Sequence, residues 1–195
     1  MKFILLFQKI ILNLVVIVLL PVSARATGWS SMVNVGYFSD SFKNTTTTTS
    51  SLMYYGVALL LDLDKKSAYL LGFHYGMGTQ VSNDGITTDT FKNTDMGPFM
   101  AAYLNKSRTV GLFAGYNIIS KGTFSSGGGT PSEWSGTSLQ AGFGCDYETW
   151  DGVWVGAKIM MYSMSYNRDV TLGATSANIS YSRTWMAPMI SLSLR

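Results

Sequence analysis

His74 is the only histidine of the chain and the first residue to consider for chemistry. A histidine acts as a general base when a serine hydroxyl lies within hydrogen-bond reach and a carboxylate orients the imidazole. Ser82 and Asp84 follow His74 closely, but they fall beyond the end of the segment that carries it. A histidine that is hydrogen-bonded to interior neighbours fits the same residue. We therefore predict an interior histidine and a chain that is not an enzyme.

Four charged residues stand in segments that are otherwise almost free of charge. They are Asp95, Asp146, Lys158 and Arg183. Lys158 lies on the segment after Asp146 and could pair with it across a β-ladder. A conduction pathway would place such charges around an open passage, whereas ion pairs would close a narrow interior. We prefer the second interpretation and predict an interior charge network of these four residues and His74.

The sequence predicts neither a metal site nor a bound cofactor. Cys145 is the only cysteine, which excludes an intramolecular disulfide framework and a cysteine-based zinc site. The glycine-rich stretch at residues 125–131 lacks the lysine and the strand-to-helix context of a phosphate-binding loop.

Residues 1–26 have the three regions of a secretory signal peptide. A basic start is followed by the apolar run from Ile10 to Leu20, and Ala24 and Ala26 form the small-x-small pattern that a signal peptidase reads. We predict cleavage after Ala26, with a retained signal anchor as the alternative. Removal takes 3 of the 14 basic residues, and 14 − 3 = 11 then balance 11 acidic residues. The charge therefore gives no support for a nucleic-acid partner.

Alternation with a period of two dominates residues 27–195 and predicts β-strands. The uncharged faces of the four clearest segments are Tyr69, Leu71, Phe73, Tyr75 and Met77; Val110, Leu112, Ala114, Tyr116 and Ile118; Leu139, Ala141, Phe143, Cys145 and Tyr147; and Val153, Val155, Ala157, Ile159 and Met161. The opposite faces carry glycines together with His74, Asn117, Gln140 and Lys158. Glycines on the inside of a small barrel leave room for large neighbours, so we predict that this second face lines the interior.

Four further segments are noisier, at residues 29–38, 52–61, 95–104 and 179–194. Pro98 and Pro188 weaken two of them, because proline disfavours a β-ladder. Short charged connections at 62–66, 105–108 and 148–152 alternate with longer ones rich in Thr, Ser, Gly and Asn at 39–51, 79–94, 120–135 and 166–178. Seven connections imply eight antiparallel strands, with all the short turns at one end.

The uncharged faces favour contact with lipid over contact with water. A soluble barrel such as a lipocalin has its apolar face inside, and a secreted β-sandwich would explain the alternation but not the rhythm of the connections. We place Phe38, Phe99, Phe113, Trp154 and Trp185 in the interior, which eight strands leave just wide enough for side chains. The sequence therefore predicts an all-β chain that folds as an up-and-down transmembrane barrel.

In this architecture the chain resembles the small eight-stranded, porin-like outer-membrane β-barrels of Gram-negative bacteria. The resemblance covers residues 27–195, although the last segment ends in Arg195 without the aromatic residue that is typical of the family. It implies an outer-membrane location with both chain ends in the periplasm, contact with outer-membrane lipid, and a structural or surface-interaction role for four extracellular loops, which would contact envelope or surface components. We expect a monomer. A narrow channel for small solutes and a lipid-modifying barrel enzyme that uses His74 are the alternatives.

Overall fold

The computed structural model describes residues 28–43, 47–62, 68–171 and 177–195. The predicted signal peptide, with Ala24 and Ala26, lies outside these residues. No helix in the described part of the chain is both long and apolar enough to cross a membrane.

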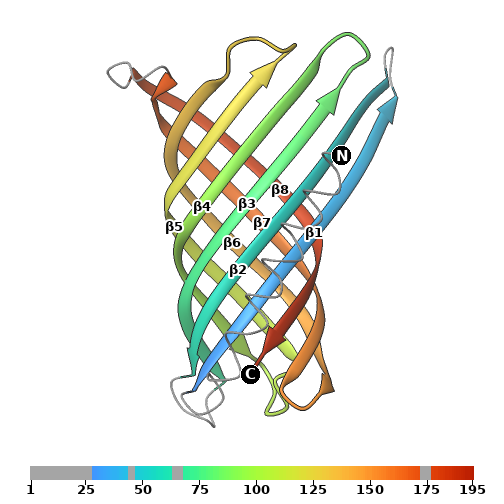
Figure 1. The fold of residues 1–195 in the computed structure, drawn as a ribbon, viewed down its shortest axis with the longest axis vertical. Coiled ribbons are helices and arrows are strands. Elements are labelled where there is room, and N and C mark those ends of the chain that lie inside the picture. The colour runs from blue at the N-terminus through green and yellow to red at the C-terminus, as the bar shows by residue number, and fades with distance from the viewer. Residues whose placement is uncertain (1–27, 44–46, 63–67, 172–176) are drawn as a thin grey trace, which may run out of the picture.

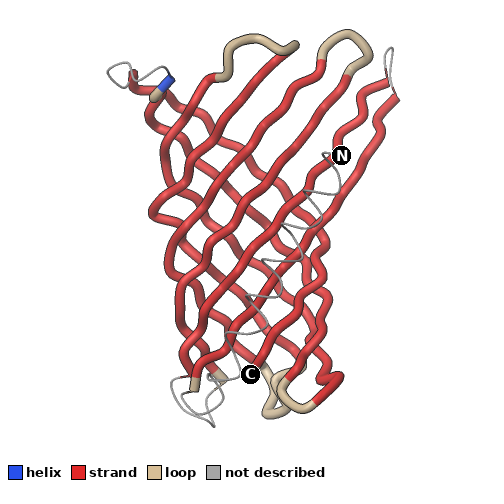
Figure 2. Tube along the Cα trace, viewed as in Figure 1, coloured by secondary structure: helices blue, strands red, loops and turns tan. Residues whose placement is uncertain are grey.

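Eight antiparallel strands form a closed barrel in which each strand pairs with its neighbours in the sequence and β8 pairs with β1 (Figures 1 and 2). The strands are β1 (Trp29–Lys43), β2 (Thr47–Asp62), β3 (Tyr69–Asn83), β4 (Thr88–Tyr103), β5 (Val110–Ser126), β6 (Ser132–Trp150), β7 (Val153–Asp169) and β8 (Ala177–Leu194). The predicted fold class is confirmed. We call the end with the short turns at residues 104–109 and 151–152 the turn end, and the end with residues 84–87 and 127–131 the tip end.

The outer face carries an apolar belt where the alternation predicted contact with lipid. Leu112, Phe143 and Ile159 are exposed, whereas the neighbouring Phe113 and Lys158 are buried. The outward apolar runs at 69–77, 110–118, 139–147 and 153–161 are each nine residues long. A tilted strand needs about 9–11 residues to cross the hydrocarbon core of a bilayer, so the belt has the height of a membrane.

Exposed aromatic residues lie near the two edges of this belt. Trp29, Tyr69 and Tyr147 are exposed near the turn end. Tyr37 and Tyr75 are also exposed, and they lie closer to the tip end on β1 and β3. Such rings suit the interfaces between hydrocarbon and water.

The strands are longer than the sequence predicted, and the prediction of four long loops was wrong for most of their residues. Of the segment 79–94, only 84–87 lies outside β3 and β4, and of 120–135 only 127–131 lies outside β5 and β6. Serine, threonine and asparagine suggested loops, but threonine also favours strands. Here the ladders continue past the apolar belt, as in the Ser82–Asp89 and Lys92–Thr123 pairs.

Both strand prolines lie where pairing is interrupted. The β4–β5 register shifts between Met96 and Phe99, around Pro98, and β5 also shifts against β6 between Asn117 and Ser120. The seam between β1 and β8 ends at the Gly36–Met189 pair, next to Pro188. Proline lacks the N–H that a ladder needs, which explains how these positions fit a closed sheet.

Candidate functional site

The lumen of the barrel holds the buried polar residues, and Asp146 is the centre of the layer nearest the turn end. Arg195 forms an ion pair with one oxygen of Asp146, and the Nζ of Lys158 lies 3.7 Å from the other. The hydroxyls of Tyr103 and Ser191 donate to the same carboxylate at 3.2 and 3.1 Å. A buried carboxylate needs such partners, because its desolvation is otherwise costly.

The two cations of this layer are also covered by aromatic rings. The Nζ of Lys158 lies 4.0 Å from the ring centroid of Phe113, and the guanidinium of Arg195 lies 4.4 Å from that of Tyr103 and 4.6 Å from that of Trp154. Cation–π contacts of this kind strengthen when water is excluded. The layer therefore combines charge pairing with close packing.

Glycines make this arrangement possible, as the alternation predicted. Asp146 pairs in the ladder with Gly156, and Lys158 with Gly144. A Cβ at Gly156 would lie 1.9 Å from Asp146 Oδ1, and one at Gly144 would lie 2.5 Å from Lys158 Cγ. Each charged side chain thus occupies the space that a side chain on the next strand would fill.

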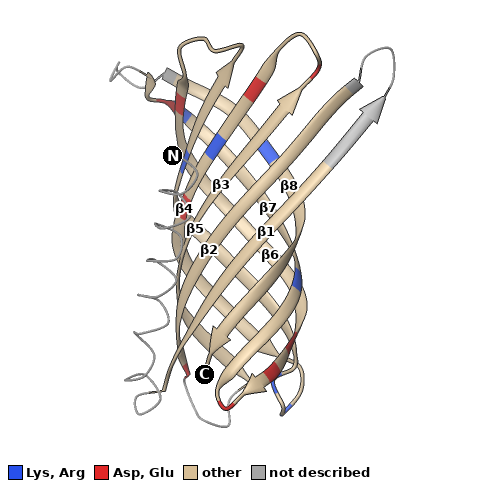
Figure 3. Ribbon diagram, turned by 45° about the vertical axis from the view of Figure 1, so that its right-hand side comes forward, with Lys and Arg blue, Asp and Glu red and all other residues tan. Residues whose placement is uncertain are grey.

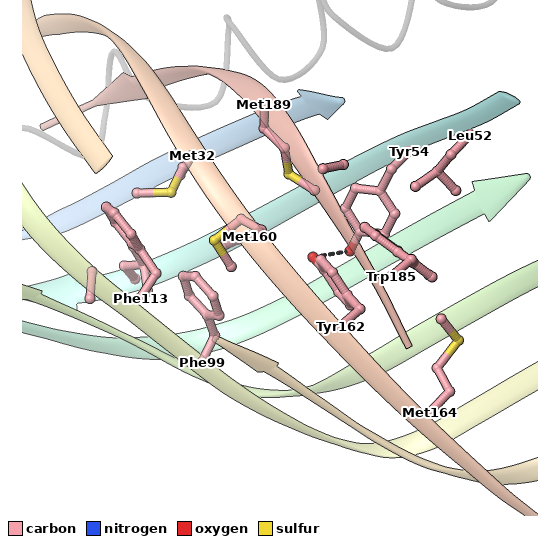
Figure 4. Close-up of a cluster of buried hydrophobic side chains, with 14 of the residues drawn as sticks. Met32, Leu52, Tyr54, Phe99, Phe113, Met160, Tyr162, Met164, Trp185 and Met189 are labelled. Atoms are coloured by element: carbon pink, nitrogen blue, oxygen red, sulfur yellow. Dashed lines mark hydrogen bonds between the residues drawn. The ribbon is translucent and has the colours of Figure 1, made fainter. Parts of the chain in front are cut away.

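A layer of aromatic residues crosses the middle of the lumen (Figure 4). The hydroxyl of Tyr162 donates to that of Tyr54, which lies 3.0 Å from Nε2 of His74. The rings of Tyr162 and Trp185 stack with their centroids 4.2 Å apart. These residues come from β2, β3, β7 and β8, so they connect strands from different sides of the barrel.

Asp95 lies in the same middle region and is held by neutral donors. The amide of Asn93 donates to one oxygen, and the hydroxyl of Ser138 donates to the other at 2.8 Å. Asn117 donates in turn to Ser138 at 2.9 Å. No ion pair to Asp95 occurs among the described residues.

Arg183 belongs to a third layer toward the tip end. Its Nε and Nη2 both donate to Oε1 of Gln80, at 3.1 and 2.8 Å, and its guanidinium lies 4.4 Å from the ring centroid of Phe91. Trp134 lies beside this layer and contacts Tyr181 at a centroid distance of 4.8 Å.

The structure therefore separates the five residues of the predicted charge network. It brings Asp146 and Lys158 together, and it places His74 and Asp95 in the middle and Arg183 nearer the tip end. Sequence reasoning missed the roles of Arg195, Tyr54 and Gln80. Arg195 follows the last alternating residue, and the segment that contains Tyr54 is apolar on both faces. The alternation therefore singled out neither of these two residues.

Ser82 and Asp84 have partners other than His74. Ser82 donates to Ser50 at 3.3 Å, and Asp84 accepts from the backbone N–H groups of Thr87 and Ile86 at 2.7 and 2.9 Å in the turn that joins β3 and β4. These two hydrogen bonds lower the pKa of the Asp84 carboxyl from its usual value, and the bond from Thr87 has the larger effect. No group of three or more potential metal ligands occurs within the described ranges.

Comparison with known proteins gives similarity at the level of fold. No protein-family model matches the chain, and no curated protein matches it. Among solved structures, neisserial surface protein A is similar with a TM-score of 0.53 and 9% identity, over 86% of this chain and 97% of that one. The translocator domain of the autotransporter NalP from Neisseria meningitidis has a TM-score of 0.45 and 13% identity, over 86% of this chain and 62% of that one.

This chain has the fold of a small outer-membrane β-barrel. The identity to these proteins is too low to carry more than the fold, and the apolar belt gives the physical reason for a place in a membrane. The lumen of this barrel contains buried layers of polar and aromatic side chains.

Proposed function

We propose that this protein is a closed, lipid-embedded barrel that serves as an anchor and presents its tip end to envelope or surface components. The observation that carries the proposal is the set of three side-chain layers in the lumen, centred on Asp146, on Tyr54 and Tyr162, and on Arg183. The exposed apolar belt supports the membrane anchor.

A solute would have to displace these layers to pass. Breaking a buried ion pair by removing one partner costs about 3–5 kcal/mol, and Asp146 has two cationic partners. The stacked rings of Tyr162 and Trp185 add a second obstruction that is rigid and apolar. These features favour the anchor over the alternative of a narrow channel.

The tip end supplies a polar surface. Beyond the belt the outward positions become mainly serine and threonine, among them Thr79, Thr123, Ser135 and Ser163. Hydroxyl groups can donate and accept hydrogen bonds, so strands that rise out of the membrane suit contacts with polar molecules. We place this end outside the cell, and both chain ends in the periplasm, because the short turns lie at the opposite end.

Single-channel recording in planar bilayers tests the closed lumen. We expect the folded protein to give no stable conductance steps, and we expect Tyr162→Ala combined with Trp185→Ala to give them, because that variant opens the middle layer. Reproducible steps with the unmodified protein would favour the channel instead.

An epitope tag tests the orientation. We expect a tag inserted at Gly128 to be labelled on intact cells and a tag inserted at Ser107 to be labelled only after the outer membrane is opened. The reverse result would overturn the assignment of the two ends.

A further inference from the structure

Two lysines project from the outer face of adjacent strands on the tip side of the apolar belt. Lys92 on β4 and Lys121 on β5 are exposed, and each is flanked along its strand by buried, inward residues. Lys92 pairs with Thr123, and Lys121 pairs with Thr94, so the two lysines are diagonal neighbours in the ladder. Diagonal neighbours lie roughly 7–8 Å apart. We call Lys92 and Lys121 the basic pair.

The surroundings of the basic pair are positively charged overall. The ladder row of Lys121 continues through Ser135 to the exposed Arg168 on β7, while Glu133 lies beside Thr123. Neither lysine forms an ion pair within the described part of the chain. In Figure 3 the middle of the barrel is mostly without charged segments, and these gather toward the two ends. The basic pair thus offers positive charge where the apolar belt gives way to the polar zone.

An apolar groove crosses the outer face of the same two strands inside the belt. It is shallow and largely open to the outside, with a volume of about 410 Å³, and the residues that line it include Leu71, Pro98, Met100, Ala114, Tyr116 and Leu139. It adjoins the place where the register of β4 and β5 shifts around Pro98. An interrupted ladder bends the sheet locally, which accounts for a hollow on an otherwise regular face.

Along the membrane normal, the distance from the basic pair to the groove is about the thickness of one leaflet of the hydrocarbon core. Pro98 is 98 − 92 = 6 residues along β4 from Lys92. At about 3.3 Å per residue on a strand tilted by about 40°, six residues correspond to roughly 15 Å of depth. This is about half of a hydrocarbon core of about 30 Å. An acyl chain whose headgroup contacts the basic pair therefore reaches the level of the groove.

We propose that the basic pair and the groove together bind one lipid of the tip-side leaflet, a lipid whose headgroup carries an uncompensated phosphate. The phosphate accepts hydrogen bonds from the ammonium groups of Lys92 and Lys121, and an acyl chain that lies along the tilted strands fills the groove. A lipid is the partner that offers an anion at the interface and a hydrocarbon chain within the belt. The site rests on the membrane placement of the barrel and goes beyond its proposed role as a closed anchor.

Native mass spectrometry of the full barrel, released from detergent micelles, tests this site. The micelles contain phosphatidylglycerol or, as the neutral-headgroup control, phosphatidylcholine. We expect the unmodified protein to retain one phosphatidylglycerol in preference to phosphatidylcholine. Lys92→Gln combined with Lys121→Gln should weaken retention of phosphatidylglycerol roughly tenfold or more, because each basic residue contributes near an anionic headgroup. Lys106→Gln, the loss of one positive charge at the turn end, should leave retention unchanged.

The groove is tested by filling it. Ala114→Phe should reduce retention of both lipids, and Ala157→Phe, the same change on the outer face of β7, should not. The heat-dependent shift on a detergent gel checks that each variant is folded. The proposal would be overturned if the unmodified protein retained the two lipids equally, or if excess inorganic phosphate displaced the lipid. It would also be overturned if Lys106→Gln weakened retention as much as the double lysine variant, or if Ala157→Phe weakened it as much as Ala114→Phe. None of these results depends on whether the lumen conducts, so the proposed function stands or falls separately.

Discussion

Asp146 meets two cations in the lumen, so removing the anion and removing one cation have different consequences. Asp146→Asn leaves Lys158 and Arg195 buried together without a carboxylate, and we expect a loss of about 3–5 kcal/mol in the free energy of unfolding. Lys158→Met leaves Asp146 paired with Arg195 and bonded to Tyr103 and Ser191. Its loss should be less than half as large. Urea unfolding in lipid vesicles measures the free energy of unfolding of both variants. Equal losses in the two variants would contradict the view that Arg195 still pairs with Asp146 when Lys158 is removed.

Gly156 leaves open the space that the carboxylate of Asp146 occupies. A Cβ there would lie 1.9 Å from Asp146 Oδ1 and 2.7 Å from both the carbonyl oxygen of Cys145 and Ser191 Oγ. We expect Gly156→Ala to destabilise the barrel by about 1–3 kcal/mol, because overpacking forces neighbours to move. In Gly36→Ala the nearest atom is the flexible Met189 Cγ at 3.0 Å, and the loss should be smaller. The same unfolding assay compares the two variants, and a larger loss of stability for Gly36→Ala would contradict the tight packing around Gly156.

The strands extend beyond the segments in which apolar and polar side chains alternate. Ladder pairing continues through Gln80–Phe91 and Ser82–Asp89, in a segment whose composition suggested a loop. We expect the amide protons of residues 80–82 and 90–92, which lie in the β3–β4 ladder, to exchange slowly in micelles. The amides of Gly85 and Ile86 donate to side chains within an exposed turn and should exchange faster. Hydrogen exchange measured by NMR gives both rates. Fast exchange throughout residues 79–94 would instead support the long loop that the sequence predicted there.

The alternation predicted most of the fold because contact with lipid demands a face without charge, and that demand is visible in each segment. Which side chains meet across the lumen depends on the stagger between strands, which single segments do not contain. The sequence therefore placed Asp146 and Lys158 on the inner face but did not show that Arg195 joins them. The ends of the strands were misjudged because outside the membrane both faces are polar, so alternation disappears while pairing continues.

For the molecule as a whole, the central claim is that one face of every strand touches lipid and the other looks into a filled lumen. Ala141 and Gln140 are neighbours on β6, the first exposed and the second 1% exposed. In the background of Cys145→Ser, a nitroxide label can be placed on Ala141→Cys or on Gln140→Cys in vesicles. Power saturation then measures collisions with molecular oxygen, which enters lipid, and with a water-soluble nickel chelate. We expect frequent collisions with oxygen at position 141 and few collisions with either reagent at position 140. Access of the nickel chelate to position 140, or the opposite pattern at the two positions, would contradict it.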